Sequence, residues 1–325
     1  MLGALYAVLA AACFGFNNAS ARRGVLSGTA LQGLAISMPL GILLFVIGAS
    51  VLGEWQQFSR LSARGIALLS AAGFMHFVWG RYFNIRSLAA VGSNIAGPVQ
   101  QAQLLLALAL AIVFLGETLT PLKVVGIVLI TSAPAYILRR RARSKAGDGP
   151  ATAPEFKPRM VEGYVCALLT ALGFGSSSVL VRAGLDGTGL SFLGGFISYA
   201  AAVALVALIM FVPGRFREVR GMTRVSAKWF VFSGVSVSMS QMFRYLALGV
   251  APVTIVQPLQ SLSLMFRMIF GYFINREHER FERYIIVGIA VSLVGALALT
   301  VSSEFVLRHV DLPGWLAGLA SWTWP

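Results

Sequence analysis

Long apolar runs separated by short polar or basic connections dominate the pattern of this chain. Ten such stretches can be marked, at about residues 2–21, 30–52, 63–83, 91–115, 121–138, 162–182, 190–212, 227–248, 252–274 and 284–302. A helix that crosses a bilayer needs roughly 20 apolar residues. Most of the stretches are too long and too evenly apolar for the alternating strands of a membrane barrel. The pattern therefore predicts an all-α membrane protein with ten transmembrane helices.

One segment, residues 139–161, interrupts this pattern because it is basic, polar and rich in Gly and Pro. Such a composition is typical of a linker. The chain after residue 302 is too short and interrupted to span, and its Trp315, Trp322 and Trp324 suit a membrane interface. We therefore expect a five-helix unit at 1–138, a linker at 139–161, a second five-helix unit at 162–302 and an interfacial tail at 303–325.

The two five-helix units share short motifs at a constant spacing. An odd number of spans in each copy forces the second copy to lie upside down relative to the first. Inverted repeats of this kind enclose a site near the midplane of many secondary transporters. The pairs at a spacing of 160 are Phe14-Gly15 with Phe174-Gly175, Arg22 with Arg182, Pro98 with Pro258, Gln100 with Gln260, and Glu117 with Glu277; Arg81-Tyr82 pairs with Arg244-Tyr245 at a spacing of 163.

Composition agrees with a membrane protein and changes the meaning of the charge. Hydrophobic residues make up 57% of the 325 residues and charged residues 12%, with a formal net charge of +14. In a soluble protein that excess would point to nucleic acid. Here 18 of the 23 Lys and Arg residues outside apolar runs lie in odd-numbered connections. The positive-inside rule then places the linker in the cytoplasm and both termini outside.

Several function classes have no support in the sequence. The chain contains no nucleotide-binding loop and no Ser-centred nucleophile elbow, so we expect neither ATP-driven pumping nor an enzyme. His76, His278 and His309 are far apart, and Cys13 and Cys166 lie singly in apolar runs, so neither a metal nor another cofactor is expected. The first apolar run lacks a positive n-region and is interpreted as a retained span.

Charged residues within the spans point to the chemistry of a cargo. All twelve Asp and Glu residues fall in loops, tails or span ends, which disfavours exchange of lipophilic cations against protons at a buried carboxylate. Arg81, Arg244 and Arg267 instead lie within apolar runs. A buried guanidinium can bind a carboxylate or phosphate through paired donors. The alternative is that these arginines snorkel to the interface.

Neutral polar side chains at membrane depth complete the predicted site. They can line a cavity, or they can only hold the helices together by interhelical hydrogen bonds. Glu117 is expected instead to cap the helix that directly follows it. The predicted substrate-binding residues are Asn17, Asn18, Arg81, Tyr82, Gln100, Ser177, Arg244, Tyr245, Gln260 and Arg267.

These motifs and the duplication resemble the drug/metabolite transporter superfamily, and within it the ten-helix EamA-type proteins. The resemblance rests on Phe14-Gly15 with its repeat, Pro98 with Pro258, and residues 115–118 (Leu-Gly-Glu-Thr). It implies a secondary carrier of small metabolites in the inner membrane, often an exporter, that works by alternating access.

The arginines within the spans, together with the absence of acids there, add an organic anion or zwitterion as the expected cargo. A lipid-linked phosphate flippase, a non-transporting membrane scaffold and, last, a membrane-embedded enzyme are the alternatives. The expected partners are the lipid bilayer and the small-molecule solute; a homodimer is left open, and nucleic acid is not expected.

Overall fold

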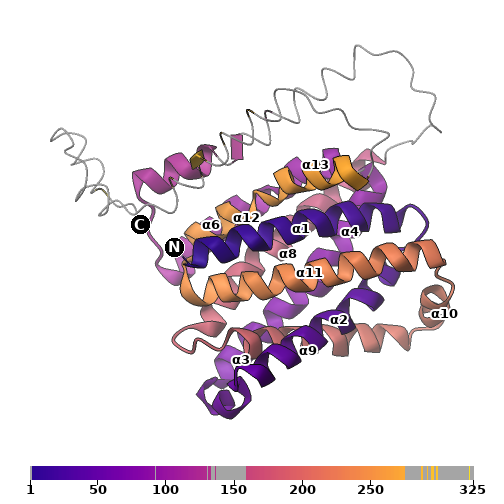
Figure 1. Cartoon of the computed structure of the whole chain (residues 1–325), viewed down its shortest axis with the longest axis horizontal. Coiled ribbons are helices and arrows are strands. Elements are labelled where there is room, and N and C mark those ends of the chain that lie inside the picture. Colours follow the sequence, from indigo (N-terminus) through magenta and orange to yellow (C-terminus); the bar gives the residue numbers. More distant parts are fainter. Residues whose placement is uncertain are drawn as a thin grey trace.

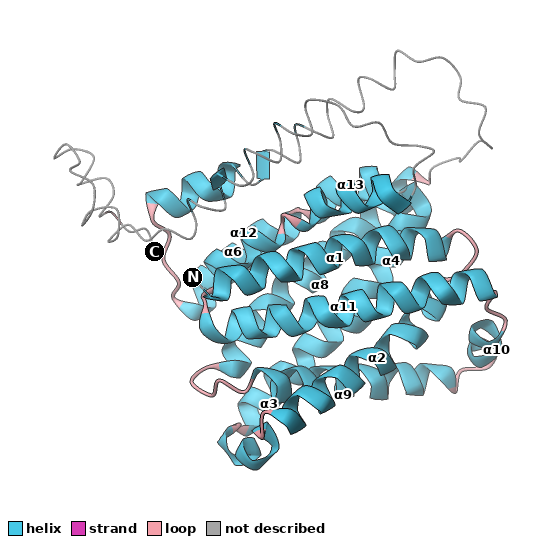
Figure 2. Ribbon diagram, in the orientation of Figure 1, coloured by secondary structure: helices cyan, strands magenta, loops and turns pink. Residues whose placement is uncertain are grey.

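In the computed structural model, the described part of the chain consists of helices and their connections (Figures 1 and 2). The structure describes residues 2–91, 93–129 and 159–274, with the isolated positions 131, 132, 136, 287, 291, 294, 295, 298 and 322. The helices of the first half are α1 (Leu2–Val25), α2 (Ala30–Val51), the short 3-10 helix η1 (Glu54–Arg60), α3 (Ala63–Gly73), the π-helix η2 (Phe74–Gly80), α4 (Arg81–Val91), α5 (Ser93–Gln100) and α6 (Ala102–Leu115). Those of the second half are α8 (Met160–Leu185), α9 (Ser191–Met210), α10 (Arg215–Arg220), α11 (Arg224–Val250), α12 (Val253–Gln260) and α13 (Ser263–Ile274).

This arrangement confirms the predicted all-α membrane fold. Five of the described helical segments are long and apolar enough to cross a membrane, and the bent pair 54–60 with 63–91 raises the number to six. Residues 121–129 of the predicted fifth span are helical. Most of the linker, nearly all of the predicted tenth span and nearly all of the tail lie outside the described residues, so the count of ten stays a prediction.

Two predicted spans are broken helices, and the breaks come at corresponding places in the two halves. The span predicted at 91–115 divides at Gln101 into α5 and α6, and the span at 252–274 divides at residues 261–262 into α12 and α13. Pro98 and Pro258 precede the breaks. Proline lacks the N–H that would continue the helical ladder and leaves a carbonyl four residues earlier without its helical donor. Broken helices at membrane depth are characteristic of transporter sites.

The helices of one half pack against the third-span helices of the other half. α1 packs along α11, while α8 packs against α3, η2 and α4. The same relation reaches single hydrogen bonds: Arg22 Nη1 donates to the carbonyl of Leu88 (2.7 Å), and Arg182 Nη1 donates to that of Leu248 (2.9 Å). Donors and acceptors both differ by 160 positions. The described contacts thus follow the duplication seen in the sequence.

Close helix contacts around a buried aromatic cluster hold the two halves together. Phe45, Phe77 and Tyr199 are fully or almost fully buried, and the rings of Phe77 and Tyr199 lie 3.9 Å apart between centroids. A Cβ on Gly73 would lie 2.1 Å from the backbone oxygen of Ser198. Only glycine permits this approach, because backbone atoms cannot move aside as a side chain can. Small residues at a helix crossing are the usual means of close packing in membranes.

Candidate functional site

Arg244 lies at the centre of a hydrogen-bonded cluster of uncharged side chains from three helices. Its Nη1 donates to Gln241 Oε1 (3.1 Å), and its Nη2 donates to Ser177 Oγ (3.2 Å) and Ser178 Oγ (3.0 Å). Ser178 in turn donates to Gln257 Oε1 (2.7 Å) on α12. Arg244 is only 2% exposed. A buried guanidinium whose acceptors are neutral keeps its full positive charge.

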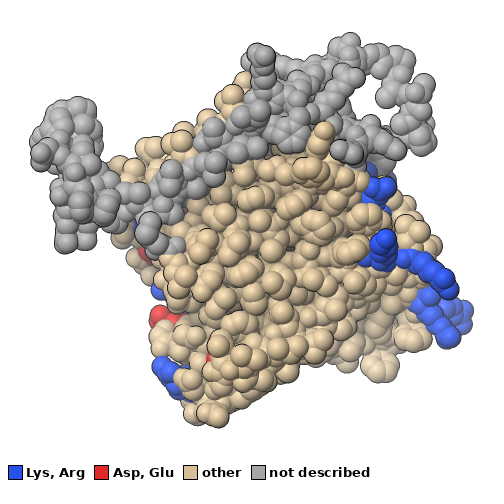
Figure 3. Space-filling view, in the orientation of Figure 1, with Lys and Arg blue, Asp and Glu red and all other residues tan. Residues whose placement is uncertain are grey.

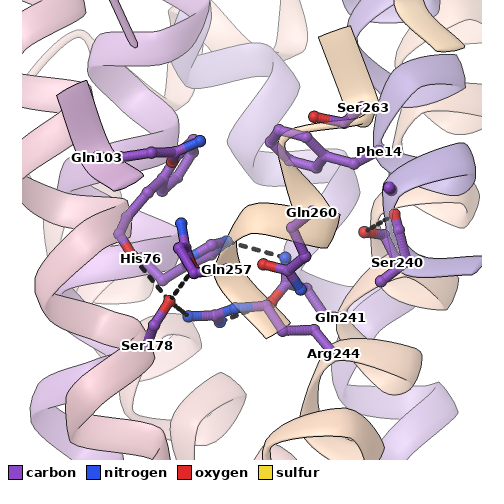
Figure 4. A pocket seen from close by; sticks show the side chains of 13 residues that line it. Phe14, His76, Gln103, Ser178, Ser240, Gln241, Arg244, Gln257, Gln260 and Ser263 are labelled. Carbon is purple, nitrogen blue, oxygen red and sulfur yellow. Dashed lines mark hydrogen bonds between the residues drawn. The ribbon is translucent and has the colours of Figure 1, made fainter. Parts of the chain in front are cut away.

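This cluster borders a small internal cavity between the halves (Figure 4). Its volume is about 30 Å³, which is enough for a water molecule but not for an organic solute. No carboxylate lies among the described residues that line it. The lining residues are Ala10, Ala11, Phe14, His76, Gln103, Phe174, Ser178, Ser240, Gln241, Arg244, Gln257, Gln260 and Ser263.

Arg81 lies in a second polar cluster and not in the lining of the cavity. Its Nε donates to Ser37 Oγ (3.1 Å), its Nη1 to Asn17 Oδ1 (3.3 Å) and its Nη2 to Ser233 Oγ (3.2 Å). Ser233 also donates to Asn17 Oδ1 (2.7 Å), while Asn17 Nδ2 is buried without a hydrogen-bond partner among the described residues. The Arg81 cluster joins α1, α2, α4 and α11.

The remaining predicted residues are divided among different surroundings. Asn18 and Gln100 meet at Asn84: Asn84 Nδ2 donates to Asn18 Oδ1 (3.2 Å), and Gln100 Nε2 donates to Asn84 Oδ1 (2.9 Å). Gln260 lines the central cavity and Ser177 binds Arg244. These placements bring Arg244, Ser177 and Gln260 to the central region.

Three predicted residues lie elsewhere. Tyr245 is buried in the aromatic cluster, with its ring 5.5 Å from that of Phe45. Tyr82 lines a separate cavity near α10. Arg267 is buried on α13 outside the cavity lining, and its Nη1 would lie 3.3 Å from a Cβ placed on Gly97. The motif that pairs arginine with tyrosine does not place its two members in one site.

The hydrogen bonds also change the predicted symmetry pair. Arg244 donates to Ser178, which precedes Arg182 by four residues. Arg182 in turn donates to Leu248, which follows Arg244 by four residues. In the first half, Asn84 donates to Asn18, which precedes Arg22 by four residues. Arg22 in turn donates to Leu88, which follows Asn84 by four residues. At the spacing of 160, Asn84 therefore corresponds to Arg244, whereas Arg81 corresponds to Gln241. The spacing of 163 matched residue types, not places in the fold.

Sequence reasoning missed His76 and Gln241. His76 is 5% exposed in η2, its ring stacks on Phe174 with centroids 4.4 Å apart, and its Nε2 lies 2.8 Å from Gln241 Nε2. A single histidine in an apolar run carries no spacing signal. Gln241, however, could have been found as the residue 160 positions after Arg81.

Glu117 and Glu54 cap helices of the opposite half. Glu117 Oε1 and Oε2 accept hydrogen bonds from the backbone N–H groups of Val253 and Thr254, both 2.7 Å, at the start of α12. The expectation that Glu117 caps the helix that follows it is therefore wrong. Gly116 ends α6 with φ +63, a left-handed conformation that glycine adopts easily, and it redirects the chain there.

Glu54 makes the corresponding contact at α9. Its Oε2 accepts from Leu193 N (2.6 Å) and its Oε1 from Phe192 N (3.4 Å). Burial raises the pKa of the Glu54 carboxyl above its ordinary value, while the hydrogen bonds from Leu193 and Phe192 oppose that shift. Both carboxylates join the halves at the end of the molecule where α1 begins.

Two larger cavities open toward the opposite ends of the bundle. One, of about 560 Å³, lies between α3, α6 and α8, and Arg64, Glu117 and Arg182 are among its lining residues. The other, of about 430 Å³, lies between α2, α4, α9 and α10, and is lined by Leu34, Tyr82 and Arg86 among others. Each is bordered by both halves. The small central cavity therefore lies in a bundle that is hollowed at both ends.

The comparisons with known proteins agree with this architecture. The sequence model of the EamA-like transporter family matches residues 1–139 and 161–301. A solved crystal structure with 18% sequence identity superposes with a TM-score of 0.66, over 96% of this chain and 99% of the other. At that identity the likeness shows the fold alone. The search of curated proteins finds no match.

Proposed function

Because the chain belongs to the EamA-like transporter family, it is a multi-pass membrane transporter and not an enzyme, and on this basis we propose that it moves a small organic anion or zwitterion across the inner membrane. Arg244 is the residue that would bind the solute's carboxylate, with Ser177, Ser178 and Gln260 around it. The direction favoured by the family resemblance is export. The coupled movement of the two halves would give alternating access.

The observation that carries this proposal is the unbalanced charge at Arg244. Its described acceptors are a glutamine and two serines, and the described lining of the cavity contains no carboxylate. A charge at the centre of a membrane helix costs about 2.5–3.5 kcal/mol on insertion scales. An anionic group would neutralise it, whereas a cation would add a second positive charge.

The cavities at the two ends support alternating access. At about 30 Å³ the central cavity must expand before a metabolite can enter, and each larger cavity is bordered by helices of both halves. Rocking of one half against the other would enlarge the central cavity toward one end at a time. Inverted-repeat transporters work by this kind of motion.

The test is uptake of radiolabelled solutes of three charge classes by purified protein in liposomes. Succinate represents anions, serine represents zwitterions and choline represents cations. We expect uptake of succinate or serine, and a loss of at least about tenfold in Arg244→Lys, which keeps the charge but loses the paired donors. Arg224→Lys, exposed on the same helix, is the matched control. Preferred uptake of choline would refute the proposal.

A lipid-linked phosphate is the second candidate, favoured by the cavity near α10. Its lining joins apolar Leu31, Leu34 and Ile209 to Arg86 and Arg215, which suits an acyl chain beside a phosphate that displaces their present partners Glu162 and Glu218. A flippase assay with a fluorescent polyprenyl phosphate in the same liposomes separates the two candidates. Movement of that lipid without uptake of succinate or serine would favour the flippase.

A further inference from the structure

His76 is a buried titratable group beside the Arg244 cluster. It lies in η2, a π-helix, and such segments are often found at functional sites. Its ring borders the central cavity (Figure 4). The same ring stacks on that of Phe174. Among the described residues of the cavity lining, it is the only one that can gain or lose a proton near neutral pH.

The hydrogen-bond network determines which nitrogen of His76 carries the proton. Gln241 Oε1 accepts from Arg244 Nη1, so the Nε2 amide group of Gln241 must point toward His76. Amide Nε2 can only donate, and His76 Nε2 must therefore be the accepting nitrogen. The imidazole is neutral in this state, with its proton on Nδ1. That Nδ1 is buried and has no hydrogen-bond partner among the described residues.

The groups around His76 would not balance a positive imidazolium. The charged groups that act on it are Arg244 on α11 and Arg81 on α4. The cavity lining from the other elements is uncharged. It consists of Ala10, Ala11 and Phe14 on α1, Gln103 on α6, Phe174 and Ser178 on α8, Gln257 and Gln260 on α12, and Ser263 on α13.

From this geometry we propose that His76 is a proton-binding site coupled to Arg244 through Gln241, so that the solute and a proton bind together. The inference rests on the proposed function, because the solute supplies the negative charge that a third positive group requires. It adds a proton as the coupling ion of that function, and proton and solute then cross in the same direction, so that export requires an outward solute gradient larger than the inward proton gradient. No residue outside the three is needed to connect the proton to the solute site.

A change of hydrogen-bond direction would transmit the proton's effect. When a proton from water binds Nε2 of His76, that nitrogen becomes a donor and needs an acceptor. Gln241 can supply one by rotating its amide, which turns Oε1 toward His76 and removes it from Arg244 Nη1. Arg244 Nη1 is then available to the carboxylate of the solute. Departure of the solute reverses each step and releases the proton.

The first test reads the tautomer directly, by nitrogen NMR of the full chain labelled with ¹⁵N-histidine in lipid nanodiscs. Histidine is present at three positions only, and His76→Gln identifies the signal of His76. We expect the neutral Nδ1–H form at pH 7.5 without solute. The neutral Nε2–H form, or a charged imidazolium under those conditions, would overturn the inference even if the protein transports anions.

The second test is the pH profile of serine uptake between pH 6.5 and 8, where serine stays a zwitterion, with a pH-sensitive dye in the liposome lumen. We expect uptake to fall about tenfold as the pH rises, with about one proton entering per serine. His76→Gln, which can accept from Gln241 but cannot become charged, should give a flat profile and no proton entry. His309→Gln, outside the described residues, should behave as wild type.

The outcomes separate this inference from the proposed function. Serine uptake that is independent of pH and carries no proton in the wild type would overturn the role of His76 and leave the proposed function standing. If serine is not taken up, the same measurement with succinate decides whether uptake of the solute is coupled to a proton. Failure of both solutes to enter would refute the proposed function, and the coupling with it.

Discussion

At the residue scale, the buried arginines show how a membrane protein can keep a positive charge without a carboxylate. Arg81 satisfies three of its nitrogens with Ser37, Asn17 and Ser233, and Arg244 satisfies two with Gln241, Ser177 and Ser178. Neutral acceptors compensate for lost hydration, but they do not cancel the charge. Of the two arginines, only Arg244 borders the cavity, so Arg81 is expected to contribute more to stability than to binding.

Replacement of Arg81 by lysine tests whether Arg81 contributes mainly to stability. A lysine ammonium is a point charge that cannot reproduce the planar fork joining three acceptors on three helices. At about 1–3 kcal/mol for each buried group left without its partner, we expect a clear fall in the melting temperature in detergent. Arg64→Lys, at an exposed arginine, should leave that temperature unchanged. Equal melting of both variants would contradict the structural role of Arg81.

Glu54 makes stability depend on pH. Its pKa is raised in the folded protein, mainly by burial, so the folded state holds the carboxyl proton more tightly than the unfolded state. The stability that this proton contributes is complete below the ordinary pKa of Glu and is lost as the pH rises through the raised value. The melting temperature of wild type should therefore fall over that interval. Glu54→Gln should remove this part of the pH dependence. If the melting temperature of the variant changed with pH as steeply as that of the wild type, the contribution of Glu54 would be refuted.

What the sequence could predict at this scale was depth and residue type. Arginines in apolar runs had to be buried or at an interface, and Arg244, Arg81 and Arg267 are buried. The sequence could not predict to which side of its helix each residue points, because spans that are apolar on nearly every face show no clear periodicity. Tyr245 consequently lies in the aromatic cluster, next to Arg244 in sequence but outside the cavity lining.

At the scale of helices, the sequence predicted most spans and the duplication but not the partners of their ends. Glu117 precedes residues 121–129, a helix, yet it caps α12, which is more than 130 residues away. The short distance along the sequence favours the N-terminus of the helix at 121–129 as the partner of Glu117. The structure favours the farther one, because the left-handed turn at Gly116 redirects the chain and places the carboxylate within reach of α12.

Removing the charge of Glu117 should weaken the contact between the halves. In Glu117→Gln only one oxygen remains to accept from the two N–H groups at the start of α12, and the interaction with the helix dipole is lost. We expect a loss of about 1–2 kcal/mol in stability, measured by chemical unfolding in micelles. Asp186→Asn, exposed at the same end of the molecule, should be neutral. A loss of equal size in both variants would refute the capping role.

At the scale of the whole molecule, basic residues gather at one end (Figure 3). That end carries α10, with Arg215, Arg217 and Arg220, and is opposite the end where α1 begins (Figure 1). The chain enters α8 at this basic end, because Arg159, the residue before α8, donates its backbone N–H to the carbonyl of Ala90 near the end of α4. The part of this charge bias that falls on described residues thus lies at one end of the fold, as the positive-inside rule requires.

The predicted orientation can be measured with single cysteines in a variant that lacks Cys13 and Cys166. A membrane-impermeant maleimide should label Asp186→Cys in intact cells, because that position is exposed at the end opposite to α10. Ser144→Cys, in the predicted cytoplasmic linker, should react only after the membrane is permeabilised. The reverse pattern would mean that the protein is inserted upside down.

The paired caps of Glu54 and Glu117 have a consequence for the cycle of movement. Both carboxylates belong to the first half, and both hold backbone N–H groups that begin helices of the second. Separation of the halves at this end would leave four backbone N–H groups without the carboxylates that accept their hydrogen bonds, and this cost opposes opening there. In the proposed rocking motion, opening at this end would therefore have to break both of these contacts between the halves.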